Sequence, residues 1–201
     1  KMSKIRVVHY INQFFAGVGG EEQAHIEPEL RKELPPISQQ LQAKLGEEFE
    51  IVATVVCGDS YFNENLEKAQ ATLLEMIKGE NPQLFIAGPA FNAGRYGVAA
   101  GTITKLIQDE LHIPAVTAMY IENPGVDMYR KDVYIVEATD SAAGMRKVLP
   151  KLAKLAAKLA KGEEILSPAE DGYIAKGVRV NYFHEDRGSK RAVDMLIKKI
   201  K

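Results

Sequence analysis

Five short apolar segments recur along this chain, and each is followed, directly or after a loop, by a stretch with helical spacing. They occupy residues 5–11, 49–57, 84–87, 113–119 and 133–136. Residues 49–57 are apolar almost without a break, which is typical of a strand buried on both faces of a parallel sheet. This alternation predicts an α/β domain with parallel strands and right-handed crossovers.

The pattern favours a flavodoxin-like or Rossmann-like, doubly wound, mostly parallel five-stranded sheet with helices on both faces. With strands numbered along the chain, we expect the order 2-1-3-4-5. We place this domain at residues 1–162. Residues 163–201 are expected to form an extension or linker that packs on the same domain, extended over 173–183 and ending in a short helix at 187–201.

Three local features qualify this pattern. Residues 12–36 are rich in Gly and Pro and predict a long functional loop or an inserted lid. Residues 58–63 are typical of a turn before a helix over 63–78. Pro150 lies about ten residues into the helix that begins near Asp140 or Ser141, where it predicts a kink or a restart.

Composition narrows the class of protein. The formal net charge of −1 argues against a nucleic-acid-binding protein, which would carry a basic face. No apolar run is long enough to span a bilayer, and no signal peptide is visible. The single cysteine excludes an internal disulfide. Together these features predict a cytoplasmic protein.

The loops after the strands carry the candidate binding site. Because the carboxyl ends of parallel strands lie at one edge, we expect residues 12–20, 57–63, 88–97 and 120–130 to meet there. The third loop, GPAFNAGRYG, combines glycines that permit close backbone approach with Arg95, whose guanidinium fork suits a carboxylate. An equally weighted alternative is a tight turn with Arg95 solvated on the first helical turn.

The candidate substrate-binding residues share a place at this rim. They are Asn12, Gly19, Gly20, Cys57, Asn92, Arg95, Tyr96, Glu122 and Asn123. Glu122 is either a general base or amine partner, or a solvated loop acid. Cys57 is either a nucleophile or redox thiol or, as we favour because the chain has no resolving cysteine, a small buried hydrophobe that lines the site. No catalytic residue is assigned.

Several other kinds of site are not favoured. The Gly17–Gly20 segment lacks a nucleotide-binding pattern and runs into Glu21 and Glu22, which would repel phosphate. The histidines are scattered and predict no metal site. His9, inside the first strand, is expected to be a hydrogen-bonded core residue. We expect no cofactor bound by this chain, although a flavin is not excluded.

Four loop motifs, in order, resemble one family: VVHYINQFFAGVGGEE at 7–22, CGDSYFNEN at 57–65, AGPAFNAGRYGV at 87–98 and ENPGVDMYR at 122–130. The chain resembles component B selenoprotein subunits of glycine/sarcosine/betaine reductase, within the glycine/betaine/sarcosine/D-proline reductase family. The likeness extends to residues 141–146 and 187–194 but covers only the amino-terminal half of such a subunit.

The resemblance implies a role in anaerobic amino acid catabolism. In such systems the amine forms an adduct on a pyruvoyl group of a partner subunit, and a selenocysteine of component B displaces the amine. That selenocysteine lies in the carboxyl-terminal half, so Cys57 does not take its role. The resemblance implies an oligomeric complex whose partners are the pyruvoyl subunit and the selenocysteine half, and a small amine-bearing carboxylate as substrate.

Three functions follow from these observations. The chain supplies a substrate pocket or partner interface in a reductase that deaminates glycine, sarcosine or betaine, and is inactive alone. Alternatively, it is a non-catalytic assembly module that docks the selenocysteine half and the pyruvoyl subunit. A weaker alternative is a flavodoxin-like cofactor carrier. The sequence leaves open which amine is the substrate, and whether the chain is a shortened, split or free-standing relative.

Overall fold

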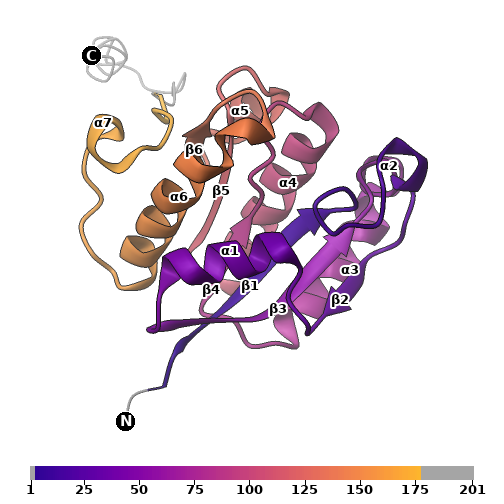
Figure 1. The fold of residues 1–201 in the computed structure, drawn as a ribbon, viewed down its shortest axis with the longest axis horizontal. Coiled ribbons are helices and arrows are strands. Elements are labelled where there is room, and N and C mark those ends of the chain that lie inside the picture. The colour runs from indigo at the N-terminus through magenta and orange to yellow at the C-terminus, as the bar shows by residue number, and fades with distance from the viewer. Residues whose placement is uncertain (1–2, 178–201) are drawn as a thin grey trace, which may run out of the picture.

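The computed structural model of the chain describes residues 3–177. These residues form a six-stranded sheet with the spatial order β2-β3-β1-β4-β5-β6 (Figure 1). The strands are β1 (Ile5–Asn12), β2 (Glu29–Arg31), β3 (Phe49–Cys57), β4 (Leu84–Ala87), β5 (Ala115–Tyr120) and β6 (Tyr134–Ala138). Five of them run parallel, in the order that the sequence predicted.

The sheet has six strands instead of the five predicted. The additional strand, β2, pairs antiparallel with β3 and lies inside the segment that was expected to be a loop or lid. Its three residues contain one apolar side chain, Leu30, which is too short a pattern for the sequence to reveal a strand. Pairing with β2 satisfies backbone groups along the edge of β3, which would otherwise be exposed.

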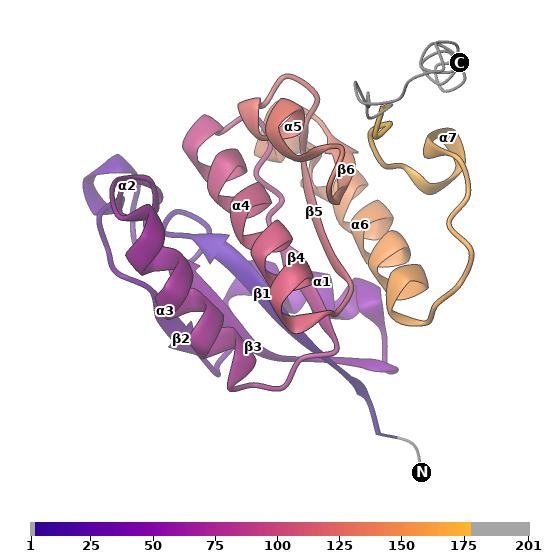
Figure 2. The same ribbon diagram turned by 180° about the vertical axis from the view of Figure 1, so that it is seen from behind.

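Helices cover both faces of the sheet, which confirms the predicted fold class. The helices are α1 (Pro36–Leu45), α2 (Asp59–Glu64), α3 (Leu66–Lys78), α4 (Gly94–Leu111), α5 (Pro124–Tyr129), α6 (Met145–Ala160) and α7 (Pro168–Asp171), with 3-10 turns η1 (Glu21–Gln23) and η2 (Ala142–Gly144). Helices α1 and α6 lie on the face seen in Figure 1, and α3 and α4 lie on the face seen in Figure 2. No helix in residues 3–177 is long and apolar enough to cross a membrane.

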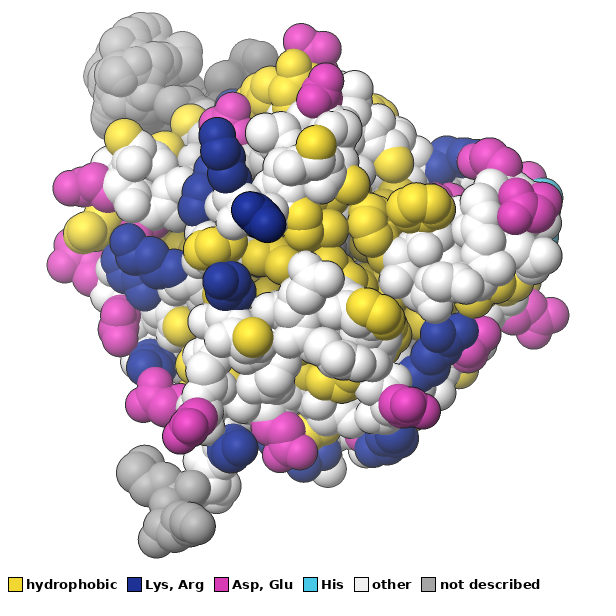
Figure 3. Space-filling view, in the orientation of Figure 1, with side chains coloured by type: hydrophobic (Ala, Val, Ile, Leu, Met, Phe, Trp, Pro, Cys, Tyr) yellow, Lys and Arg dark blue, Asp and Glu magenta, His cyan; other side chains and the backbone are white. Residues whose placement is uncertain are grey.

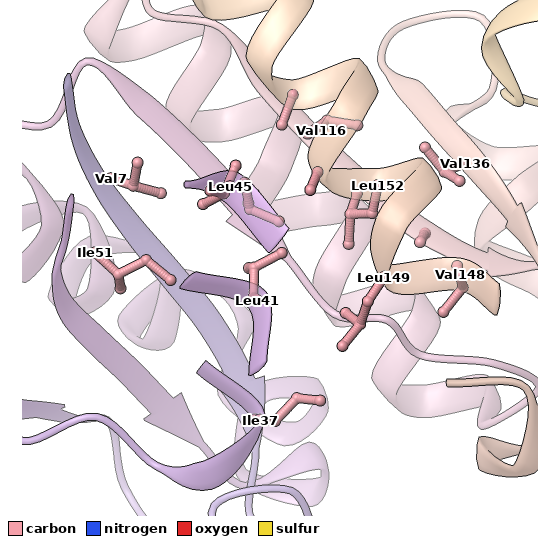
Figure 4. Close-up of a cluster of buried hydrophobic side chains, with 14 of the residues drawn as sticks. Val7, Ile37, Leu41, Leu45, Ile51, Val116, Val136, Val148, Leu149 and Leu152 are labelled. Carbon is pink, nitrogen blue, oxygen red and sulfur yellow. The ribbon is translucent and has the colours of Figure 1, made fainter. Parts of the chain in front are cut away.

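Each face of the sheet has its own hydrophobic core. On the α1 and α6 side, Leu41 and Leu152 meet strand residues such as Val7 and Val116 (Figure 4). On the other side, Leu73 of α3 and α4 residues pack against the opposite face of the same strands. Because β1, β3, β4 and β5 are covered on both faces, they are apolar nearly throughout.

Two helix predictions were wrong in their details. Residues 58–63 were expected to be a turn, but α2 begins at Asp59, and its Phe62 is fully buried. Helix α6 was expected to kink or restart at Pro150; it does not restart, because it continues through that residue, and the kink stays a prediction. Burial of neighbouring side chains, including Leu149 and Leu152, outweighs the cost of a proline within the helix, about 3 kcal/mol.

His9 is a core residue, as expected, and it connects three elements. Its Nε2–H donates to the backbone carbonyl of Gly88 at 2.7 Å. Because a carbonyl oxygen only accepts, Nδ1 must accept from Ser38 of α1 at 2.8 Å, and Ser38 in turn accepts from Thr54 of β3. Burial lowers the pKa of His9 from 6.5 to about 4, although the bond to Gly88 opposes the effect.

Helices α4 and α5 approach closely through glycines. A Cβ atom on Gly97 would overlap the side chain of Asn123, and one on Gly125 would lie 2.6 Å from the Gly97 carbonyl oxygen. Asn123 accepts from the backbone N–H of Gly125 and donates to the carbonyls of Phe91 and Ala93, at 2.9 and 3.0 Å. The bonds from Asn123 to Phe91 and Ala93 therefore hold the loop after β4 against the start of α5.

The described part of the extension is anchored to the sheet and to α6. Lys158 donates to both carboxylate oxygens of Asp171, at 3.0 and 2.8 Å. Tyr173 forms an isolated antiparallel bridge with Val136. The remainder of the predicted extended stretch and the helix expected at 187–201 lie outside the described residues. The domain boundary at residue 162 stays a prediction.

Candidate functional site

A cavity of about 340 Å³ lies where the loops after several parallel strands meet. The lining residues come from the ends of β1, β3, β4 and β6; they are Asn12, Gln13, Phe14, Phe15, Gly20, Glu21, Asp59, Ala90, Phe91, Asn92, Ala93, Tyr96, Asp140, Ser141 and Ala142. Three of the four loops expected at this rim contribute. Residues 140–142 take the place of the expected 120–130 loop.

The lining combines aromatic faces with acidic groups. Phe14, Phe15, Phe91 and Tyr96 supply the aromatic rings, and Glu21, Asp59 and Asp140 supply the carboxyl groups. No Lys or Arg is among these lining residues. Aromatic faces and carboxylates both attract cations, so the cavity suits an ammonium group better than a phosphate.

The surface on the α1 and α6 side of the molecule is partly apolar. Hydrophobic side chains gather across the middle of the face that α1 and α6 cover, and many charged side chains lie around its border (Figure 3). Phe14, which lines the cavity, is 60% exposed. An exposed phenylalanine beside an open cavity is a feature that binding sites share.

Asp59 is the most constrained acid of the cavity. Register pairing places Asn12 opposite Cys57, at the carboxyl ends of β1 and β3. Asn12 Nδ2 donates to Asp59 Oδ2 at 2.9 Å, and the Asp59 backbone N–H donates to Gln13 Oε1 at 3.1 Å. Oδ1 of Asp59 is buried and has no hydrogen-bond partner. Burial raises the pKa of Asp59 to about 6, although Asn12 and Arg95 act in the opposite direction.

Arg95 lies beside the cavity without lining it. Its Nη1 donates to the hydroxyl of Ser60, and its Nη2 donates to the carboxylate of Glu21, with Oε1 at 2.6 Å. The side chains of Arg95 and Glu21 are 45% and 74% exposed. The guanidinium is therefore held by a carboxylate of its own chain, in an exposed pair that contributes little to stability.

Two tyrosine hydroxyls are buried beside Asp59. The rings of Tyr10 and Tyr96 have centroids 6.4 Å apart; the Tyr10 hydroxyl has no hydrogen-bond partner, and the Tyr96 hydroxyl has only a weak interaction with the Asn12 backbone. Burial raises the pKa of both phenols, and the nearby Asp59 acts in the same direction. Unpaired buried polar atoms are costly, and their concentration here is typical of a site that binds a further group.

The remaining predicted residues are placed as follows. Asn12, Gly20, Asn92 and Tyr96 line the cavity, whereas Gly19, Cys57, Glu122 and Asn123 are not among the lining residues. Cys57 is fully buried, and burial, followed by the charge of Asp59, raises the pKa of its thiol to about 12. Glu122 is exposed, and Asn123 caps α5. Their roles in substrate binding stay predictions.

Sequence reasoning missed the importance of Asp59, Gln13 and the aromatic pair Phe14 and Phe15. The signal that could have found Asp59 is its position immediately after Gly58 at the end of a buried strand. No group of His, Cys, Asp and Glu within residues 3–177 could hold a metal ion.

The fold and the cavity define an α/β protein with a ligand cavity at the carboxyl ends of its parallel strands. Over residues 4–201 the chain matches the family described as glycine/sarcosine/betaine reductase selenoprotein B. The chain belongs to this family, which confirms the resemblance seen in its loop motifs. No solved structure matches it.

The relatives are components of named reductase complexes. The chain is 72% identical over its whole length to 46% of the glycine reductase complex component B subunit gamma of Peptoclostridium litorale. It is 58% identical, over 99% of its length, to 46% of the sarcosine reductase complex component B subunit beta of Peptoclostridium acidaminophilum. Over 97% of its length it is 38% identical to 45% of that organism's betaine reductase complex component B subunit beta. The chain thus spans less than half of these relatives.

Proposed function

We propose that this chain forms the part of a component B subunit that binds the small amino-acid substrate of a reductase complex. The chemistry of reductive deamination would depend on a selenocysteine and a pyruvoyl group carried elsewhere in the complex. The observation that carries the proposal is the cavity of about 340 Å³, lined by carboxyl groups and aromatic rings, in a chain of this family.

Glycine is the substrate that we favour. The identity to the glycine reductase component is higher than to the sarcosine component and much higher than to the betaine component. Glycine, sarcosine and betaine share a carboxylate and differ only in the methylation of the nitrogen. The part of the cavity that contacts the nitrogen would therefore determine which of them binds.

Arg95 is the proposed receptor for the substrate carboxylate. A guanidinium pairs with a carboxylate through directional, charge-assisted hydrogen bonds. Arg95 already holds a carboxylate, that of Glu21, which is itself a lining residue. Since an exposed ion pair of this kind is worth at most about 1 kcal/mol, an incoming carboxylate can displace Glu21.

Calorimetric titration of the 201-residue chain with glycine, sarcosine and betaine tests the proposal. Arg95→Gln should abolish detectable binding of all three. The matched control is Lys105→Gln, which removes another exposed cation of α4 that pairs with an acid, Asp109. Unchanged affinity in Arg95→Gln would refute the assignment of this residue.

Removing the carboxylate of Glu21, which competes with the substrate for Arg95, should increase the affinity for glycine. Glu21→Gln should tighten glycine binding by up to about fivefold, because Arg95 no longer has to exchange one carboxylate for another. Glu22→Gln is the control, since Glu22 bonds the Gly20 backbone N–H and not Arg95. Weaker binding in Glu21→Gln would show that Glu21 contributes to the site directly.

The second candidate function is an assembly module that docks the other parts of the complex. Phe14, 60% exposed at the cavity, favours this reading, because a continuing chain or partner could cover it. Copurification of the chain with the selenocysteine half, and its loss in Phe14→Ser, would support docking. A flavin carrier is disfavoured, because the cavity carboxylates would repel the flavin phosphate.

A further inference from the structure

Asp59 is held in place by its own chain yet lacks a partner on one oxygen. Oδ2 accepts from Asn12, and the backbone N–H is held by Gln13. Oδ1 has no partner, and the residue is only 6% exposed. A carboxylate so buried ordinarily has its oxygens hydrogen-bonded or its charge paired. The free oxygen points to a donor that is supplied from outside the chain.

A positive charge beside the cavity lies close to Asp59. Arg95 donates to Ser60, the residue next to Asp59, and its positive charge is close enough to lower the pKa of Asp59. A small amino acid is a zwitterion with a carboxylate and an ammonium group one carbon apart. The Arg95 guanidinium and the Asp59 carboxylate, which lie close together in space, form the complementary pair.

We propose that Asp59 is the residue that binds the ammonium group of the substrate, through Oδ1, while Arg95 receives its carboxylate. This inference rests on the proposed function of the cavity as an amino-acid site. Asn12 and Gln13 are positioning residues, because they fix the orientation of Asp59. Glycine and sarcosine can donate N–H hydrogen bonds to Oδ1, whereas the quaternary nitrogen of betaine cannot.

The other acids of the cavity are less suited to this role. Glu21 is 74% exposed and already paired with Arg95, and Asp140 is exposed. An ammonium group that leaves water gains most from a carboxylate in a desolvated position. Asp59 combines that position with an unpaired oxygen.

Binding by Asp59 makes affinity depend on pH. Burial favours the neutral carboxyl, so Asp59 takes up a proton as the pH falls through about 6 and loses its attraction for an ammonium group. The titratable and charged groups around it come from several elements; they are Tyr10 of β1, Cys57 of β3, Glu21 of η1, Arg95 and Tyr96 of α4, and Asp140 after β6. Glycine should therefore bind more weakly at pH 5 than at pH 7.5.

The test compares Asp59→Asn with Asp127→Asn by calorimetry at pH 7.5. Both variants change net charge equally, but Asp127 is on the surface of α5, with its side chain 93% exposed. Asp59→Asn should weaken glycine binding at least tenfold, the loss expected for a hydrogen bond between charged groups. Affinity for betaine should fall less, and Asp127→Asn should bind glycine like the unchanged chain.

Infrared spectroscopy supplies a readout that does not depend on affinity. At pH 5 the unchanged chain should show a protonated-carboxyl band that is absent in Asp59→Asn. Added glycine should reduce this band, because an ammonium group binds the ionised form.

The outcomes separate the two proposals. If the unchanged chain binds glycine and Asp59→Asn binds it equally well, the role of Asp59 is overturned while the cavity remains an amino-acid site. If the unchanged chain binds neither glycine nor sarcosine, the proposed function falls and this inference falls with it. An equal loss for glycine and betaine would also contradict hydrogen bonding through Oδ1.

Discussion

Replacing Asp59 with asparagine should make the folded chain more stable at neutral pH, although it should impair ligand binding. The folded state raises the pKa of this carboxyl from 3.8 to about 6. Between these values the folded chain binds the proton more tightly than the unfolded chain does, so stability falls as the pH rises. Above about pH 6 the full cost of ionising a buried carboxyl is present.

The magnitude follows from that difference in pKa. The raised pKa of Asp59 lowers the free energy of unfolding by about 3 kcal/mol at pH 7.5, since each pKa unit is about 1.4 kcal/mol. Asparagine keeps the oxygen that accepts from Asn12 but places an amide donor where Oδ1 had no partner, at a cost of about 1 kcal/mol. The net gain in the free energy of unfolding should be about 2 kcal/mol at pH 7.5.

Urea unfolding at several pH values between 4 and 8 measures this effect. The gain should shrink as the pH falls and vanish near pH 4, where Asp59 of the unchanged chain is protonated in the folded state and no longer buries a charge. Asp127→Asn, on the exposed surface, should change stability by less than about 0.5 kcal/mol. A variant Asp59→Asn that is no more stable than the unchanged chain at pH 7.5 would refute the reasoning.

Three further perturbations test the fold. In the Asp59→Asn variant, which lacks the opposing titration of Asp59, stability should decline as the pH falls from about 6.5 toward 4, by about 3 kcal/mol, because His9 is kept neutral in the folded chain and charges readily when unfolded. Gly97→Ala should cost about 1–3 kcal/mol in thermal unfolding, because the added methyl overlaps Asn123. Lys158→Met should speed limited proteolysis near α7, since Asp171 loses its ion-pair partner. Lys158 lowers the pKa of Asp171, so this pairing should persist to a pH below the ordinary pKa of an aspartate.

Each of these has a matched control within the chain. His112→Asn should leave the acid sensitivity intact, since His112 is exposed. Gly79→Ala should be tolerated, because a Cβ there meets atoms no closer than 3.5 Å. Lys147→Met removes an exposed lysine near the other end of α6 and should not affect proteolysis. A loss of stability in Gly79→Ala as large as in Gly97→Ala would contradict the packing argument.

The parallel strands of the sheet could be predicted from the sequence. Buried strands such as β3 have to be apolar on both faces, and that requirement is visible without a structure. The strand β2 was not predictable, because Glu29, Leu30 and Arg31 are too few to show a strand pattern. Helix α2 was obscured because Gly58, Asp59 and Ser60 are typical both of turns and of helix beginnings.

The sequence predicted the location of the candidate site but not the contacts within it. Topology brings loop ends to one edge, so the general location followed from the order of the strands. The partners did not follow, because Glu21 contacts Arg95 across 74 positions of sequence. Burial decides the chemistry of Asp59, and a sequence does not distinguish a buried aspartate from a solvated one.

The segment between β1 and α1 is fixed at both of its ends. Near its start, Gln13 holds the Asp59 backbone, and near its end Arg31 donates to the Ala16 carbonyl oxygen from within β2. Residues 17–21 are held mainly by bonds within the segment, such as that from the Val18 backbone N–H to the Gln13 carbonyl oxygen, and by the exposed pair of Glu21 with Arg95. Variants that test the proposed amino-acid site should therefore change those few positions first, since insertions elsewhere in the segment would disturb the sheet edge.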